Sequence, residues 1–359
     1  MKRITIKFLT SCLGICLTFS ALAGNKDRSG QAGAAELLIN PWAQSSGLFG
    51  LNTANVYGIE AMKSNIAGLA MDSSTEVGFT YGDYLTGTNI AISNFAFAQK
   101  VGDAGVFGIN IMSMGFGDIP TTDFNNPEGY GSYHPQFLNF ELGYGKRFST
   151  HVSAGFAATF VTEQIGNIQA SGAAFDGGIQ YVTGKKDNFH IGVTLRNIGT
   201  NMVFSGAGFA VNGEAAQSSP AFAVTEQYPS QKFEMPTYLN IGVAYDFYLD
   251  QNKLKTTDAA PKHRLTAIGD FQSNSFNNDY IGAGLEYCFL NLVSFRTAYR
   301  YESGIGNSAT TTTMYTGLAI GASIQKRIAG GPLLAIDYSY RPTQRPANGV
   351  QMFGVRLSR

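Results

Sequence analysis

The sequence predicts an all-β protein: a transmembrane antiparallel β-barrel of about fourteen strands, with a short helical plug segment before it. The main observation is an alternation of apolar with polar or small residues, in segments of roughly ten residues, from Thr75 to Arg359. In residues 293–302, for example, Phe295, Tyr299 and Tyr301 fall on one face, whereas Arg296 and Arg300 fall on the other. An export signal and the lengths of the connections support the same fold.

The first 23 residues predict a secretory signal peptide. Basic residues open it, an apolar stretch follows, and Ala21-Leu22-Ala23 supplies a small-residue cleavage site before Gly24. Cys12 and Cys16 leave a lipoprotein signal as the alternative, although both lie inside the apolar stretch rather than at its end. The mature chain is therefore expected outside the cytoplasm.

Composition excludes several classes of protein. The formal net charge is zero, so there is no basic excess that would indicate binding to nucleic acid. Cleavage after Ala23 leaves Cys288 as the single cysteine, which excludes an intramolecular disulfide. No apolar run after the signal is long enough for a membrane helix, so an integral protein has to be a barrel.

Fourteen strand candidates follow from the alternation, and an even number puts both chain ends on the periplasmic side. The second candidate changes phase between Ile92 and Phe95, which a bulge would explain. The candidates begin near Thr75, Thr88, Ala104, Phe137, His151, Ala173, Asn188, Thr237, His263, Ile281, Val293, Met314, Leu333 and Gly349.

The connections alternate between short and long, as in outer-membrane barrels with short periplasmic turns and longer external loops. Short turns follow the even strands, and the longest excursions, residues 114–136 and 196–236, follow odd strands. The connection at residues 249–262 is longer than the rule predicts for the periplasmic side. The alternation of short and long connections still favours fourteen strands. It also predicts which mouth of the barrel faces the periplasm.

Face assignment predicts an apolar outer wall and a lumen of mixed charge. Opposite charges in a narrow interior pair with one another, which favours a plugged scaffold over a wide pore lined by one sign. The predicted lumen network consists of Glu141, Asp176, Arg196, Asp246, Asp270, Glu286, Arg296, Arg300 and Asp337, with Gln180 and Arg356 also facing inward.

The domain organisation predicted is a signal peptide at residues 1–23, a plug at residues 24–74 and the barrel at residues 75–359. Residues 60–70 are expected to form one short helix that ends near Gly68. An extension this short would be only marginally stable as a separate domain. The barrel lumen is therefore the simplest place for it. An ordered periplasmic tail is the alternative.

Several short motifs lie before about Gly184. They are Asp27-Arg28-Ser29-Gly30, Leu37-Leu38-Ile39-Asn40-Pro41-Trp42, Asn65-Ile66-Ala67-Gly68, Gly115-Phe116-Gly117-Asp118-Ile119-Pro120, Asn126-Pro127-Glu128-Gly129 and Gly177-Gly178-Ile179-Gln180-Tyr181. With these motifs the chain resembles the PorV/PorQ family of Bacteroidetes outer-membrane proteins, and the similarity runs over most of the chain.

The resemblance implies a fatty-acid-transporter-like barrel in the outer membrane of a Gram-negative bacterium, with the N-terminal segment in the lumen. Family members known by function serve type IX protein secretion, one type as carriers of substrates and another as anchors of an attachment partner. Many relatives have Asn-Pro-Ala-Gly where this chain has Asn65-Ile66-Ala67-Gly68, so the resemblance leaves the carrier and anchor roles both open.

The chain shows no motif of an enzyme, a cofactor site or a metal site. Its four histidines are isolated, and it contains no nucleophile elbow or phosphate loop. Aromatic and acidic residues on the two long loops fit the binding of a partner, or alternatively an inward-folded cap. These residues are Asp118, Asp123, Tyr130, Tyr133, Phe204, Phe209, Phe222, Tyr228 and Phe233.

The functional hypothesis from sequence is therefore a non-enzymatic outer-membrane barrel of type IX secretion. It would contact lipid with its wall and bind secretion-system proteins or exported cargo with its external loops. The alternative is a fatty-acid-transporter-like channel for hydrophobic small molecules, and a purely structural barrel is a third option. The predicted charged interior argues against an apolar channel.

Overall fold

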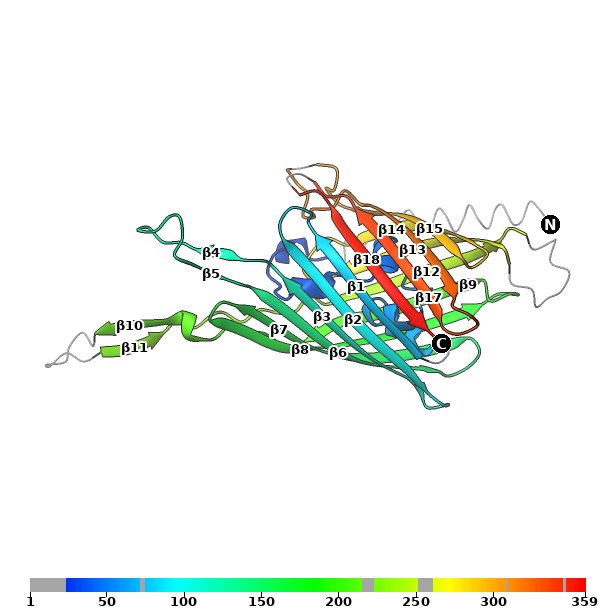
Figure 1. Ribbon diagram of the computed structural model, residues 1–359, viewed down its shortest axis with the longest axis horizontal. Coiled ribbons are helices and arrows are strands. Elements are labelled where there is room, and N and C mark those ends of the chain that lie inside the picture. The colour runs from blue at the N-terminus through cyan, green and yellow to red at the C-terminus, as the bar shows by residue number, and fades with distance from the viewer. Residues whose placement is uncertain (1–23, 72–74, 215–222, 251–260, 308, 345–346) are drawn as a thin grey trace.

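A closed barrel of fourteen antiparallel strands forms the body of the protein. The computed structural model describes residues 24–71, 75–214, 223–250, 261–307, 309–344 and 347–359, so the predicted signal peptide lies outside the described residues. Figure 1 shows the strands wrapping around the N-terminal segment. The barrel strands are β1 (Thr75–Tyr84), β2 (Ile90–Val101), β3 (Gly105–Gly115), β6 (Gln136–Arg147), β7 (Val152–Ile165), β8 (Ile168–Thr183), β9 (Phe189–Gly199), β12 (Tyr238–Tyr248), β13 (His263–Asn274), β14 (Tyr280–Phe289), β15 (Val293–Glu302), β16 (Leu318–Arg327), β17 (Leu333–Arg341) and β18 (Val350–Ser358).

The alternation predicted the strands well because a period of two places successive side chains in lipid and in the lumen. Two strands begin elsewhere. β8 starts at Ile168 rather than near Ala173, because residues 169–172 are small or polar and extend a long hairpin with β7. β16 starts at Leu318 rather than near Met314, after Gly317 turns the chain with a φ of +92°. β18 pairs with β1 and closes the barrel.

The bulge predicted in the second strand is wrong. β2 pairs without a break with both β1 and β3, and Ile92 simply points inward, where it packs with Met112 and Met352. The phase change arose because this part of the lumen is apolar. A register shift lies instead between β8 and β9, at Phe175 and Gly177.

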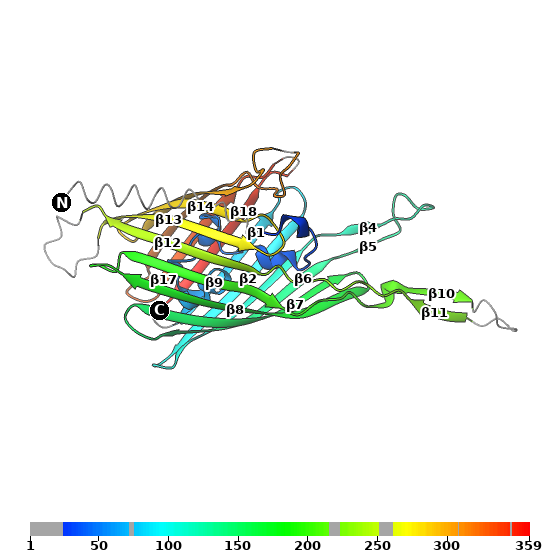
Figure 2. The same ribbon diagram turned by 180° about the vertical axis from the view of Figure 1, so that it is seen from behind.

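Two hairpins project from one mouth of the barrel, at the end away from the C-terminus in Figures 1 and 2. They are β4 (Ile119–Thr121) with β5 (Gly131–Tyr133), and β10 (Ala210–Glu214) with β11 (Ala223–Gln227), the second preceded by the short helix η5 (Ala207–Phe209). Because long loops face outward in such barrels, this mouth is external and the mouth of short turns is periplasmic.

The outer wall carries the apolar faces of the strands. Leu142, Phe156, Val193 and Ile241 are all exposed on this wall, and aromatic pairs such as Tyr144 with Phe156 (5.4 Å between ring centroids) lie on the same surface. A closed barrel satisfies every ladder hydrogen bond internally, so such a wall can contact lipid. The protein is an outer-membrane β-barrel of the Gram-negative type.

The N-terminal segment, residues 24–71, threads the lumen from the external mouth downward. Near the external mouth Gly24 donates a hydrogen bond to Asp279 (2.7 Å), and at the other end Ala70 lies against Gly145 near the close of β6. The barrel strands begin and end on the periplasmic side as predicted, but the described chain itself begins at the external mouth. No helix among the described residues is long and apolar enough to span a membrane.

This plug consists of short helical turns rather than the single helix predicted for residues 60–70. η3 and η4 are separate because Asn65 interrupts them: its amide nitrogen donates to Thr53 O (3.0 Å) and Ile179 O (3.1 Å). Its Oδ1 accepts from Ala67 N at the start of η4. The turns are η1 (Lys26–Arg28), η2 (Ala35–Leu38), α2 (Ala43–Ser46), η3 (Gly58–Lys63) and η4 (Ile66–Met71).

Candidate binding site at the external mouth

A cavity of about 580 Å³ lies at the external mouth, above the plug. This volume is within the range of small-molecule sites. Its walls combine apolar and aromatic side chains with a few polar groups. The lining comes from plug residues Ala35, Glu36, Leu38 and Ile39, from strand residues Tyr84, Met114, Phe137, Tyr238, Gln272, Asn274, Tyr280, Arg300, Glu302 and Arg341, and from loop residues Phe116, Asn277, Asn278, Thr312, Thr313, Met314 and Tyr315.

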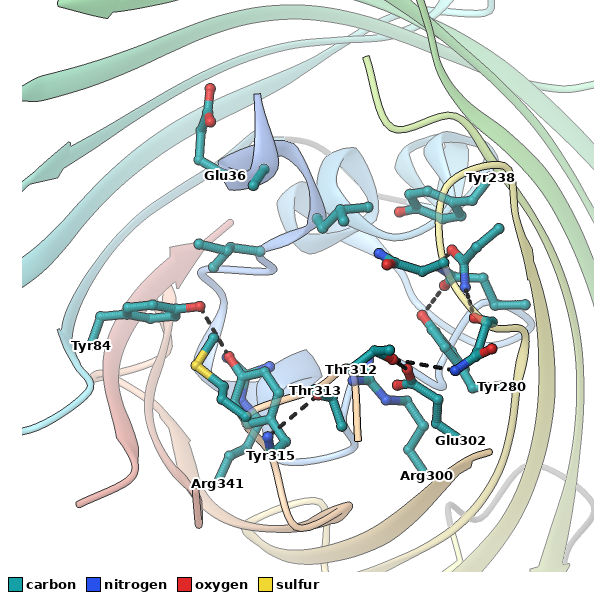
Figure 3. A pocket seen from close by; sticks show the side chains of 18 of the residues that line it. Glu36, Tyr84, Tyr238, Tyr280, Arg300, Glu302, Thr312, Thr313, Tyr315 and Arg341 are labelled. Carbon is teal, nitrogen blue, oxygen red and sulfur yellow. Dashed lines mark hydrogen bonds between the residues drawn. The ribbon is translucent and has the colours of Figure 1, made fainter. Parts of the chain in front are cut away.

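Two arginines, Arg300 on β15 and Arg341 at the end of β17, line this cavity (Figure 3). Both guanidinium groups lie against the ring of Phe49, at 4.1 Å and 5.4 Å from its centroid. Arg300 also lies over Tyr280 (4.3 Å), and Arg341 over Tyr315 (4.8 Å). Aromatic faces attract such cations and hold them in place.

The acidic residues of the cavity do not neutralise these arginines. Glu302 accepts a hydrogen bond from Thr312 Oγ1 (2.5 Å), and no ion pair joins it to either arginine in the described chain. Figure 3 shows the Glu36 carboxyl directed away from the cavity. Burial and the neighbouring Glu163 raise the pKa of Glu36 to about 8, which disfavours its charged form at neutral pH. The site therefore keeps a positive charge.

Below the cavity the plug is fixed to the wall by buried polar contacts. Lys63 of η3 pairs with Glu141 of β6 at 3.1 Å, and both side chains are almost fully buried. Gln180 donates to the carbonyls of Thr53 (3.2 Å) and Val56 (3.0 Å). Smaller cavities of about 40 Å³ and about 110 Å³ lie between the plug and the wall below the external cavity.

Most of the predicted lumen charges lie in ion pairs. Asp176 binds Arg196 at 2.8 Å, next to the register shift between β8 and β9, and Arg196 also donates to the Lys63 carbonyl of the plug. Glu286 binds Arg296 at 2.5 Å. The remaining ion pairs join Asp337 to Arg356 (2.9 Å) and Glu141 to Lys63, and Asp246 lies 3.2 Å from Nε2 of His190.

Two of the predicted network residues depart from this pairing. Arg300 stacks on aromatic rings, and its Nε has no hydrogen-bond partner in the described structure. Asp270 lies beside Thr53 of the plug and has no ion-pair partner there either. Alternation placed both residues inward correctly, but it carries no information on which residues meet across the barrel.

The loop residues predicted to bind a partner are dispersed. Neither loop folds inward as a whole, because the two hairpins extend away from the mouth (Figure 2). Phe204 and Phe233 pack together (5.6 Å between ring centroids) over Met202 and Met235 at the base, so the cap interpretation fits these two of the described loop residues. Phe209 and Tyr133 are half-buried, and Phe222 lies outside the described residues.

Two acidic loop residues have local contacts. Asp123 accepts hydrogen bonds from the backbone N–H groups of Asn125 (2.8 Å) and Asn126 (2.7 Å), which forms the hairpin tip. Asp118 lies 3.3 Å from His134. Of the aromatic residues predicted to bind a partner, Tyr130 (64% exposed) and Tyr228 (60%) are exposed. No cluster of three metal-ligating side chains occurs in the described part of the chain.

The cavity residues that sequence reasoning missed are mainly Arg341, Tyr84, Tyr280 and Tyr315. Arg341 ends its strand beside Pro342, where the alternation gives way to loop, and the tyrosines resemble ordinary girdle residues in the sequence. One feature of the sequence could have indicated the cavity. This feature is an inward arginine with no acidic residue near it on the neighbouring strands.

The fold and the site define a class: plugged outer-membrane barrels with a cavity at the external mouth. No family model matches the sequence, and no curated protein sequence matches it either. Solved structures do match the fold. A mutant of the monoaromatic hydrocarbon channel TodX has 11% identity and a TM-score of 0.53, with 88% of this chain and 97% of that chain covered.

Two further structures are similar at the same level. The monoaromatic hydrocarbon channel CymD has 10% identity and a TM-score of 0.53, covering 89% of this chain and 97% of its own. The toluene transporter TodX of Pseudomonas putida has 11% identity and a TM-score of 0.52, covering 94% and 97%. At such identities the likeness establishes a common fold.

Proposed function

We propose that this barrel binds hydrophobic small molecules at the external mouth, as a non-enzymatic uptake or sensing protein of the outer membrane. The observation that carries the proposal is the cavity of about 580 Å³, which has apolar walls and exposed rim residues such as Leu38 and Met314. Similar folds carry names of hydrocarbon channels, which agrees with this use. The sequence hypothesis of an apolar channel thus gains support over the secretion hypothesis.

The plug makes binding and passage separate steps. Ala35, Leu38 and Ile39 form one wall of the cavity, so a bound molecule would contact plug and barrel together. Because buried ion pairs hold the plug below this point, passage would require the plug to rearrange. The proposal therefore concerns capture at the external face first.

Ile39→Trp, which fills part of the cavity, is expected to lower the affinity for 1-octanol by roughly tenfold or more. Isothermal titration calorimetry of the purified barrel in an amphipol measures this. The control is Ile241→Trp on the lipid face, which should leave the affinity unchanged. Equal binding by both variants, or no binding of octanol by the native chain, would exclude this site.

A second candidate function is the binding of type IX secretion partners or cargo, and the projecting hairpins favour it. Their surfaces carry large apolar side chains in water: Phe124 is 100% exposed and Val211 is 51% exposed. Exposed aromatic side chains on loops are frequent anchors of protein interfaces. The resemblance of the N-terminal motifs to PorV/PorQ proteins agrees with this proposal.

Deletion of residues 207–228, with a short Gly-Ser linker in their place, tests the partner-binding proposal. We expect affinity capture from native membranes to lose secretion-system proteins or cargo, while the barrel still inserts and keeps its heat-modifiable migration. Replacing residues 122–129 in the other hairpin allows the capture of partners to be compared between the two hairpins. If the intact barrel is recovered alone, the secretion proposal is wrong.

A further inference from the structure

Gly24, which directly follows the predicted signal cleavage site, lies against the loop between β13 and β14 (residues 275–279) at the external mouth. Its backbone N–H donates to Asp279 Oδ2 (2.7 Å), and Asp279 Oδ1 accepts from the N–H of Asn274 (2.9 Å). Among the described residues, no ion pair joins the half-buried Asp279 to a basic side chain. This carboxylate therefore meets the nitrogen of Gly24 without a cation to balance it.

The space around Gly24 is closed on the side of the loop. An added Cβ would lie 2.6 Å from Asp279 N and 2.8 Å from Asn277 O, and both are backbone atoms that a rotamer change cannot move. A larger residue would therefore have to displace the loop. The loop accepts the smallest residue at this position and holds its nitrogen against one carboxylate oxygen.

Cleavage after Ala23 changes the chemistry of this contact. Before cleavage the nitrogen of Gly24 belongs to a neutral peptide bond, and after cleavage it is an α-amino group, which is mostly protonated at neutral pH. A hydrogen bond between a cationic donor and a carboxylate is roughly twice as strong as one between neutral groups. The same two atoms therefore form a hydrogen bond in the precursor and an ion pair in the processed chain.

The contact lies where the plug meets the rim of the external cavity. Arg28, in the same N-terminal segment, pairs with Glu234 at 2.6 Å, and its guanidinium group lies over the ring of Phe276 at 4.1 Å. Asn277 and Asn278 of the same loop line the cavity. An anchor at Gly24 would thus hold both the first residues of the plug and one edge of the cavity.

We infer that Asp279 is a binding site for the chain's own new N-terminus. Signal-peptide cleavage supplies the α-ammonium group of Gly24, which pairs with Asp279 and fastens the start of the plug to the loop at the external mouth. The plug is therefore fully anchored only in the processed protein. This inference does not depend on which molecule the external cavity binds.

Reductive methylation with formaldehyde and cyanoborohydride, read by peptide mass spectrometry, measures the reactivity of the Gly24 amine in the purified barrel. Only the uncharged amine reacts, and a carboxylate partner favours the charged form. We expect Asp279→Asn, which keeps the shape and an acceptor for Asn274, to raise the labelling rate by roughly threefold or more at pH 7. The control is Asp27→Asn, which removes an exposed carboxylate from the same segment and should leave the rate unchanged.

Insertion of one glycine after Ala23 tests the charge without changing Asp279. The ammonium group then lies one residue away, about 3.8 Å along the chain, and Gly24 keeps only its amide N–H. Hydrogen exchange of residues 25–33 measures the anchor, because Asn25 N–H donates to Asn274 O (3.3 Å) and Gly33 N–H to Glu234 O (3.0 Å). We expect exchange there to be roughly threefold faster or more, with residues 58–71 unchanged.

Intact mass first establishes that the mature chain begins at Gly24; a different first residue would overturn the inference. Equal labelling of the amine in the native chain and in Asp279→Asn would overturn it as well. Should Asp279→Asn not fold, the chain with the inserted glycine decides the question. Native exchange rates in residues 25–33 of that chain would show that the charge at Gly24 does not anchor the plug.

Discussion

Gly192→Val is expected to expel the plug from a barrel that still folds. Gly192 faces the lumen from β9, and a Cβ there would overlap the Thr53 carbonyl oxygen and lie 2.7 Å from Ala54 Cα. Both are backbone atoms of the plug, which a rotamer change cannot move aside. Overpacking of this kind costs about 1–3 kcal/mol when the structure yields only slightly. Here the strands are fixed by their ladders, so the plug is the part that moves.

Trypsin cleavage after Lys63 measures the loss of the plug, because this lysine is 4% exposed in the native structure. We expect rapid cleavage in Gly192→Val, with unchanged heat-modifiable migration of the barrel and larger ion currents in planar bilayers. The control is Gly269→Val on β13, where the added Cβ meets only Val243 Cγ2 at 3.5 Å. Equal protection of Lys63 in both variants would show that the plug tolerates the side chain.

The strands were predictable because lipid and lumen impose opposite demands on alternate residues. Val293–Glu302 shows this: its outward Phe295, Tyr299 and Tyr301 are exposed and its inward Ser294 and Arg296 are buried, as the pattern predicted. Ile92 shows the limit, because an apolar patch of lumen looks like a lipid face in the sequence. The alternation shows which residues are polar. It shows whether a side chain points to the lumen or to lipid only where the lumen is polar and the outer wall is apolar.

The candidate site was less predictable than the strands. The pairing of Lys63 with Glu141 depends on how the plug lies in the lumen, and neither the barrel register nor the plug path is encoded in local periodicity. The same limit hid the isolation of Arg300, which sequence reasoning assigned to a charge network. The cavity gathers residues from the plug, several strands and the loop at residues 312–315. Only their arrangement in space defines it.

Arg356→Met is expected to cause the largest loss of stability in the barrel. This buried arginine lies 2.9 Å from Asp337 of β17, 3.4 Å from Glu60 of the plug and 3.7 Å from Glu76 of β1. Removing one partner of a buried ion pair typically costs about 3–5 kcal/mol, because the other charge remains buried. Here three carboxylates lose their shared cation, so we expect a loss at or above that range in urea unfolding of the detergent-solubilised barrel.

The loss should depend on pH in a defined direction. Burial raises the pKa of Glu60 and Arg356 opposes this, so without the arginine the folded-state pKa rises further above the unfolded value. A folded state that holds its proton more tightly becomes less stable as pH increases. The stability of Arg356→Met should therefore be less impaired at pH 5 than at pH 8.

The control is Arg264→Met. In this variant Glu286 keeps its contact with Arg296 at 2.5 Å, and Arg264 itself is partly exposed. We expect it to cost no more than about 1 kcal/mol at either pH; a similar, pH-independent loss in both variants would contradict the role of Arg356 as the shared cation of plug and wall.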